Sequence, residues 1–280
     1  EPVTIQSHPP LSSAHQSATP AKPDACRGEI EYKDVSFIYP TSKAKTLKEI
    51  NLHIPAGSSL AVVGATGSGK STLIHLIGRF YDPTSGQVLV DGQDVRDVDH
   101  TELRRQIGMV PQDTLLFSAT IAENIAFGRP EASMAEIERV AKLAQAHAFI
   151  LQMPEGYQTK IGERGVGLSG GQRQRVAIAR AMLLDPKILI LDDSMSAVDA
   201  ETEKLLQAAI ASVMKGRTTI LVAHRLSTAQ HADRIIVLRD GEIVEQGTHA
   251  DLVASSGYYR HVLEMQQMSA RESIDQPVPA

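Results

Sequence analysis

The chain has 280 residues, of which 42% are hydrophobic and 22% charged, the composition of an ordinary globular domain with a substantial core. Its formal net charge of −5 argues against a nucleic-acid-binding surface, which requires a basic stripe. The single cysteine, Cys26, excludes an internal disulfide, and the sequence lacks an apolar stretch of about 18 residues that would span a membrane.

The two ends of the chain differ in composition from the middle. Residues 1–28 contain five prolines among serine, alanine and glutamine and show no apolar periodicity, which predicts a disordered linker. Residues 269–280 are interpreted as a disordered tail in the same way, so the ordered domain is expected to cover 29–268. The lack of an initiator methionine and the start of this domain near Glu29 favour a fragment of a longer polypeptide.

The first half of the domain combines strand-like and helical sequence. Strand-like runs cover 29–37, 50–63 and 87–91, and Asp91-Gly92 indicates the turn of a hairpin. Mostly helical sequence is expected from about 119 to 157.

The second half alternates regularly between helix and strand from Gly170 onward. Such alternation predicts a parallel sheet flanked by helices. The expected elements are helices at 172–183 and 200–214 and strands at 187–192, 218–223 and 233–238.

A glycine-rich loop, Gly64-Ala65-Thr66-Gly67-Ser68-Gly69-Lys70-Ser71, fits the pattern G-x-x-x-x-G-K-[ST] and lies between a strand-like and a helix-like run. Its glycines allow successive backbone N–H groups to point at phosphate oxygens, next to the positive end of a helix. Lys70 is predicted to contact the β- and γ-phosphates, and the Ser71 hydroxyl to ligate Mg²⁺. We therefore expect ATP as substrate and Mg²⁺ as cofactor.

An acidic pair, Asp192-Asp193, follows the apolar run 188–191. This run is continuous rather than alternating, which is typical of a strand buried on both faces of a parallel sheet. Asp192 thus stands at the carboxyl end of a strand, where ligands bind in open α/β sheets. It is predicted to be a partner of Mg²⁺; the alternative is a helix N-cap.

The pentapeptide Leu168-Ser169-Gly170-Gly171-Gln172 resembles the signature of ATP-binding-cassette (ABC) proteins, and the resemblance covers residues 29–268. Ser169 is a good N-cap, and the two glycines leave N–H groups open at the helix start. Further matches follow in the order of the family: Tyr39-Pro40 (adenine-stacking loop), Pro111-Gln112 (Q-loop), Gly162-Glu163-Arg164-Gly165 (X-loop), Ser196-Ala197-Val198-Asp199 (D-loop) and Ala223-His224 (switch histidine). The X-loop and Leu116 to Ile121 are similar to those of exporters whose membrane and nucleotide domains share one polypeptide.

The resemblance implies an α/β P-loop NTPase, with a RecA-like parallel sheet core, an antiparallel β subdomain and an α-helical subdomain over about 113–183. It implies an ATPase that powers export through a transmembrane domain, at the cytoplasmic face of the plasma (inner) membrane. That domain is expected in the same polypeptide, upstream of this fragment. A second nucleotide-binding domain is the other expected partner, and nucleic acid is not.

Individual roles also follow from the resemblance. Tyr39 is expected to stack on adenine, Gln112 to contact Mg²⁺, and His224 to contact the γ-phosphate. Asp199 is expected to order the dimer interface. Each has a structural alternative: a half-buried tyrosine, a solvated amide, a structural histidine or a helix cap. The residues expected to bind ATP are Tyr39, Gly64, Thr66, Gly67, Ser68, Gly69, Lys70, Ser71, Thr72 and Gln112, while Leu168, Ser169, Gly170, Gly171 and Gln172 are expected to close over the ATP of a partner domain.

By resemblance, Asp193 stands where the family usually carries a glutamate that polarises the attacking water. Aspartate is one methylene shorter, so its carboxylate falls about 1.5 Å short, and a misplacement of about 1 Å can reduce a rate about a hundredfold. With Lys70 and His224 as the other catalytic residues, we expect a slow ATP site in a heterodimer whose partner keeps the glutamate. Retention of His224 makes the handicap partial.

Two other functions stay open. A weakly hydrolysing regulatory module is consistent with Asp193. A DNA-maintenance ABC ATPase would carry a long coiled coil or a basic surface, but 71–167 shows no sustained heptads and the net charge is negative. An apolar patch of Leu115, Leu116 and Phe117 beside the Q-loop is expected to receive the membrane domain, unless these residues belong to the core.

Overall fold

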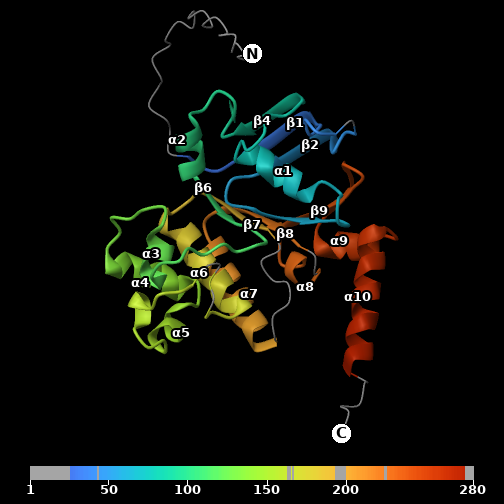
Figure 1. The fold of residues 1–280 in the computed structure, drawn as a ribbon. Helices are drawn as coiled ribbons and strands as arrows, with labels where there is room; N and C mark the ends of the chain where they lie inside the picture. Colours follow the sequence, from blue (N-terminus) through green and yellow to red (C-terminus); the bar gives the residue numbers. More distant parts are fainter. Residues whose placement is uncertain are drawn as a thin grey trace, which may run out of the picture.

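The computed structural model describes residues 26–42, 44–162, 165, 167–192, 200–223 and 226–274. These residues form two sheets with helices packed around them, as Figure 1 shows. The expected α/β architecture is confirmed. Among the described residues, no helix combines the length and hydrophobicity needed to cross a bilayer.

The larger sheet has six strands in the order β10-β9-β3-β8-β7-β6. Its strands are β6 (Ile107–Val110), β3 (Ser59–Val63), β7 (Ile188–Asp192), β8 (Thr218–Val222), β9 (Arg234–Arg239) and β10 (Glu242–Gly247). All neighbouring pairs are parallel except β9 and β10. Every residue of the central strands β3, β7 and β8 is buried, as expected for a parallel sheet with both faces covered.

The smaller sheet is antiparallel, with the order β2-β1-β4-β5. It consists of β1 (Ile30–Phe37), β2 (Leu47–Ile54), β4 (Ser85–Val90) and β5 (Gln93–Asp94). The predicted turn at Asp91-Gly92 joins β4 to β5, and both of its residues have positive φ, the backbone that two-residue hairpins require.

The single strand predicted over 50–63 is wrong, because this segment contains parts of β2 and β3, which belong to different sheets. Pro55 has no backbone N–H, and Gly57 adopts a φ of 75° in a turn closed by a hydrogen bond from Ser58 N to Pro55 O. This turn ends one strand and redirects the chain to the other sheet.

The two faces of the larger sheet carry different cores. Leu60 and Val62 of β3 pack with helix α1 (Lys70–Ile77) and the smaller sheet, whereas Ala61 and Val63 pack with helices on the other face. This division follows from the alternation of side chains along a strand. The second core includes residues of α3 (Ile121–Ala126), α4 (Met134–Leu143), α5 (His147–Leu151), α6 (Gly170–Leu183) and α7 (Ala200–Met214).

Five short or terminal elements complete the fold: α2 (His100–Arg105), the 3-10 turn η1 (Gly156–Gln158), α8 (Leu226–Ala229), α9 (His249–Ala254) and α10 (Tyr258–Ile274). Figure 1 shows α10 extending away from the body of the domain toward the C-terminus. The disordered tail predicted from Ser269 is wrong for residues 269–274, because they continue this helix. Residues 1–25 and 275–280 lie outside the described residues.

Candidate functional site

The glycine loop connects β3 to α1, as the motif predicted. Gly67 and Gly69 have φ values of 81° and 105°, which L-residues with a side chain rarely adopt. A Cβ at Gly64 would lie 2.2 Å from the carbonyl oxygen of Leu238, and one at Gly69 would lie 2.9 Å from that of Thr46. The glycines are therefore required both by backbone conformation and by close packing.

Helix α1 starts without a side-chain cap, since its N-cap residue is Gly69. The ammonium of Lys70 lies against the loop and donates to the carbonyl oxygens of Gly64 at 2.8 Å and Ala65 at 2.9 Å. Within the described part of the chain, the buried hydroxyl of Ser68 has no hydrogen-bond partner. A buried unsatisfied polar group costs about 1–3 kcal/mol, so acceptor oxygens of a phosphate fit this loop.

Three strand ends meet at the edge of the sheet that carries this loop. The pairing register places Val62 of β3 beside Val222 of β8, and Val222 beside Asp192 of β7. Asp192 is only 7% exposed. Burial lowers the pKa of His75 on α1 below its usual value, and the negative charge of Asp192 opposes this shift. Asp192 is thus placed where its charge acts on the helix that follows the glycine loop.

The predicted magnesium ligands come from three neighbouring elements. Ser71 lies exposed on the first turn of α1, Gln112 follows β6, and Asp192 ends β7, which pairs with β6. The described residues contain no cluster of three or more His, Cys, Asp or Glu side chains able to hold a metal. Mg²⁺ usually keeps several waters and takes one or two carboxylates together with substrate phosphates, so one carboxylate with a hydroxyl and an amide oxygen fits this ion.

Tyr39 lies next to the start of α1. Its hydroxyl is 2.9 Å from that of Thr72, and its ring packs edge-on against Phe37 and Tyr81, with centroid separations of 4.8 and 5.2 Å. Tyr39 therefore lies beside α1, the helix that follows the glycine loop, whereas its contact with adenine stays a prediction. Tyr81 was missed, because it lies far from Tyr39 in sequence and belongs to no motif.

The signature forms the start of α6. Ser169 caps the helix as predicted: its hydroxyl accepts from Gln172 N at 3.3 Å, and its N–H donates to Gln172 Oε1 at 2.9 Å. Leu168 is buried, and its carbonyl accepts from the Arg173 guanidinium at 2.7 Å. Gly170 faces open space, since a Cβ there would meet only Arg173, at 3.9 Å.

The signature and the glycine loop belong to helices on opposite faces of the larger sheet, because α6 packs in one core and α1 in the other. Asp193, Asp199, His224, Glu163 and Arg164 lie outside the described residues.

The expected apolar patch divides between core and surface. Leu116 is 1% exposed, so its assignment to a docking surface is wrong, whereas Leu115 and Phe117 are 53% and 38% exposed. Phe117 stacks on Phe127, which is 58% exposed, with ring centroids 4.3 Å apart. Phe127 was missed because only the fold brings it to Phe117.

Arg180 of α6 supports this aromatic pair. Its guanidinium lies 5.4 Å from the Phe117 ring and 5.7 Å from the Phe127 ring, and donates to Leu115 O and Asn124 O at 2.9 and 2.7 Å. Burial lowers the pKa of Arg180 to about 10. Among the described residues, no carboxylate forms a salt bridge with it.

The chain matches a known protein family and several of its members. The ABC transporter family model matches residues 47–196. The chain is 51% identical over 248 residues to the putative multidrug export ATP-binding/permease protein YgaD of Bacillus subtilis (strain 168), covering 89% of this chain and 43% of that protein. It is 50% identical over 255 residues to ABC transporter B family member 19 of Arabidopsis thaliana, covering 91% of this chain and 20% of that protein.

The fold is also shared with a solved structure. A bacterial Atm1-family ABC exporter with ATP bound matches 86% of this chain and 42% of its own, with a TM-score of 0.81 and 44% sequence identity. The chain therefore spans less than half the length of these relatives. Because the family model covers more than half of the chain and the fold is that of a solved exporter's nucleotide-binding domain, the chain belongs to the ABC transporter family and is its ATPase domain.

Proposed function

We propose that this chain hydrolyses ATP to drive export through a transmembrane domain, and that its own ATP site is the slow one of a heterodimer. The observation that supports ATP binding most directly is the phosphate loop: an uncapped helix start, a buried Lys70 ammonium and an unsatisfied Ser68 hydroxyl within one turn of backbone. The proposal of multidrug-type export rests on the names of the relatives and not on a feature of this fold.

Each residue of the loop has a chemical task in phosphoryl transfer to water. Lys70 neutralises charge on the β- and γ-phosphates, and backbone N–H groups at the start of α1 hold the phosphate oxygens. Ser71, Gln112 and Asp192 hold Mg²⁺, which offsets negative charge on the phosphates when bound. Tyr39 stacks on the adenine, in keeping with its half-buried position beside α1.

The proposed difference in the rate of ATP hydrolysis between this chain's site and that of its partner is attributed to Asp193. A group that positions or deprotonates water must come within about 2.6–3.2 Å of it, and aspartate at this position has a shorter reach than glutamate. His224 retains a contact with the γ-phosphate, so hydrolysis is slowed rather than abolished.

The signature acts on the ATP of a second domain. Its position on the sheet face opposite α1 and the open surface at Gly170 both favour a ligand held by another chain. Asp199 orders the interface between the two domains. Because the proposed defect lies in this chain's own site while its signature is intact, a partner with a glutamate at the matching position gives one slow and one fast site.

The transmembrane partner docks on the aromatic surface of Phe117 and Phe127. Exposed, stacked aromatic rings over a half-buried arginine are typical anchors of protein interfaces. The relatives named as ATP-binding/permease proteins are more than twice as long as the matched region, which leaves room for such a partner in the same polypeptide. The site of action is then the cytoplasmic face of the membrane.

The testing experiment compares Mg-ATP turnover of the chain with that of Asp193→Glu at several protein concentrations. We expect the variant to be about a hundredfold faster, with unchanged ATP affinity. Asp193→Asn is the matched control and should remove the residual turnover. Equal, substantial rates for the chain and Asp193→Glu would contradict the slow site and favour a homodimer.

The same experiment separates the regulatory alternative. A chain that binds ATP but shows no turnover, even as Asp193→Glu and with a glutamate-bearing partner, acts as a nucleotide-dependent regulator. Turnover that rises with protein concentration instead supports ATP sites completed by a second domain.

A further inference from the structure

Three aromatic rings pack together beside α1. They belong to Phe37 at the end of β1, to Tyr39 two residues later, and to Tyr81 in the loop between α1 and β4. The ring centroids of Phe37 and Tyr39 are 4.8 Å apart, those of Tyr39 and Tyr81 are 5.2 Å apart, and those of Phe37 and Tyr81 are 5.5 Å apart. Phe37 is buried in the core, whereas Tyr81 is 40% exposed. The roles described above give Tyr81 no task.

The Tyr39 ring is held from several sides. Phe37 and Tyr81 lie nearly perpendicular to it, with interplanar angles of 86° and 85°, an arrangement that aromatic pairs favour. At the far end of the ring, the hydroxyl of Tyr39 is 2.9 Å from that of Thr72, which is buried on the first turn of α1. None of these three contacts is a parallel stack, the arrangement expected between this ring and a base.

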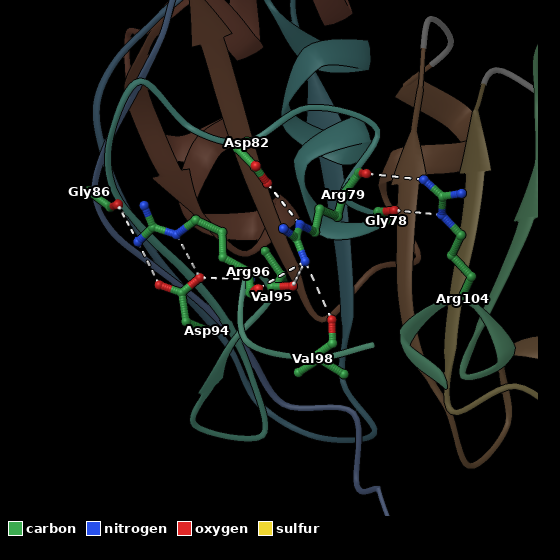
Figure 2. A network of polar contacts seen from close by, with 9 residues as sticks. All are labelled: Gly78, Arg79, Asp82, Gly86, Asp94, Val95, Arg96, Val98 and Arg104. Carbon is green, nitrogen blue, oxygen red and sulfur yellow. Dashed lines mark hydrogen bonds and ion pairs between the residues drawn. The ribbon is translucent and has the colours of Figure 1, made fainter. Parts of the chain in front are cut away.

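The loop that carries Tyr81 is anchored next to the carboxyl end of α1. Nε of Arg79 pairs with Asp82 at 2.9 Å, so the residues on either side of Tyr81 are joined. Nη1 of Arg79 donates to the carbonyl oxygen of Arg96 at 2.9 Å, and Nε of Arg104 donates to that of the C-cap residue of α1 at 3.1 Å (Figure 2). The backbone on both sides of this tyrosine is therefore tied to the smaller sheet and to α2.

The same loop is hydrogen-bonded to the segment that leads into Tyr39. The hydroxyl of Thr84 accepts from Ile38 N at 3.0 Å, and the N–H of Thr84 donates to Ser36 O at 2.9 Å. Two segments that are more than 40 residues apart in sequence therefore form one packed unit. Within this unit, backbone hydrogen bonds as well as ring contacts hold Tyr81 against Tyr39.

A fixed ring binds a base more tightly than a mobile one. A side chain that rotates freely in the free protein loses this freedom when a base stacks on it, and the loss weakens affinity by about two- to tenfold. A ring whose orientation is already set in the folded chain avoids most of this cost. The contacts of Tyr39 with Phe37, Tyr81 and Thr72 set its orientation before any ligand binds.

We infer that Tyr81 is a positioning residue for the nucleotide base, because its ring holds Tyr39 in the orientation in which adenine stacks on it. This inference rests on the proposed function, in which Tyr39 stacks on adenine and α1 holds the phosphates. Tyr81 acts through Tyr39 and does not touch the nucleotide. Its removal therefore weakens the binding of ligands that carry a base and leaves the binding of base-free phosphate ligands unchanged.

The test measures binding of Mg-ADP and of Mg-pyrophosphate by calorimetry, since ADP carries the base, pyrophosphate lacks it, and ADP is the product of the proposed reaction. Tyr81→Ala should weaken Mg-ADP binding about two- to tenfold and leave pyrophosphate binding unchanged, whereas Tyr81→Phe keeps the ring and should bind both like the unmodified chain. Phe80→Ala is the matched control, because Phe80 is the neighbouring exposed aromatic residue and packs on His75 and Arg104. Urea unfolding verifies that each variant is folded.

A double variant shows whether Tyr81 acts through Tyr39. Tyr39→Ala should weaken Mg-ADP binding about fivefold or more, and adding Tyr81→Ala to it should cause no further loss. The inference alone is overturned if Tyr81→Ala binds Mg-ADP like the unmodified chain, if it loses pyrophosphate binding equally, if Phe80→Ala shows the same loss, or if the losses in the double variant add. Mg-ADP binding that Tyr39→Ala leaves unchanged overturns the proposed stacking on adenine as well.

Discussion

Helices α1 and α6 both begin with a glycine-rich turn, but their first turns differ in what satisfies the backbone. At α1 the N-cap is Gly69, which offers no capping side chain and has a φ of 105°. At α6 the N-cap is Ser169, which exchanges hydrogen bonds with Gln172. The first leaves its N–H groups to a ligand, whereas the second is stabilised without one.

This difference separates two kinds of helix start. The start of α1 is enclosed by Thr46, at the beginning of β2, and by Leu238 of β9, so one chain forms the whole of the glycine loop's surroundings. The start of α6 is open at Gly170 and partly self-satisfied. A helix start that folds independently of ligand is suited to meet a nucleotide that another domain delivers.

The largest effect is expected at the start of α1, where an added methyl group should be far more harmful than at the start of α6. Gly69→Ala introduces a Cβ 2.9 Å from Thr46 O at a positive φ, so strain and overlap should destabilise the fold by about 2–4 kcal/mol and abolish ATP binding. The matched Gly170→Ala meets only Arg173, at 3.9 Å, and should leave stability unchanged or slightly raised. Urea unfolding and nucleotide titration measure both. Equal losses in the two variants would contradict the contrast between the sites.

An intermediate effect is expected at a buried charge that serves the fold rather than either site. Asp94 accepts from Arg96 Nη2 at 2.6 Å and from Arg96 N and Nε at 3.0 Å (Figure 2). These bonds, with the side-chain bond from Arg96 as the largest cause, hold the pKa of Asp94 below its usual value of 3.8. Asp94→Asn should cost about 2 kcal/mol at neutral pH without changing ATP affinity.

The direction in which the stabilisation by Asp94 changes with pH follows from its lowered pKa in the folded state. Because the folded pKa is depressed, the stabilisation by Asp94 is complete above its unfolded pKa and is lost as pH falls through the folded pKa. The stability difference between the chain and Asp94→Asn should therefore shrink on acidification below about pH 4. Urea midpoints measured across this range test it, and a difference independent of pH would refute the role of ionisation.

The smallest change in stability is expected at the signature cap. Ser169→Ala removes the hydrogen bond to Gln172 N and should cost about 1 kcal/mol, whereas Ser169→Asp keeps a good cap. The aspartate charge, however, repels a partner's phosphate. Ser169→Asp should thus retain stability and ATP affinity but lose the concentration-dependent part of ATP turnover. Unaltered turnover would mean that the signature serves no second nucleotide.

Prediction from sequence succeeded where the information was local. The loop Gly64 to Ser71, the strand ending at Asp192 and the cap at Ser169 each depend on neighbours within a few residues, and all three have the expected local structure. It failed where a local turn signal was passed over and where the apolar pattern became too weak to mark the end of a helix. The turn at Pro55 lay within an apparently continuous strand, and α10 extends to Ile274 through residues taken as tail.

Burial and long-range contact were decided by the tertiary structure alone. Leu116 and Phe117 are adjacent and both apolar, yet one lies in the core and the other on the surface, because only the packing of α3 and α6 assigns each a side. Phe127 reaches Phe117, and Arg104 reaches the carboxyl end of α1, across many intervening residues. The phosphate loop could be read from eight consecutive residues because backbone conformation and N–H groups make it. The aromatic surface of Phe117 and Phe127 could not, since it is assembled from side chains of separate segments.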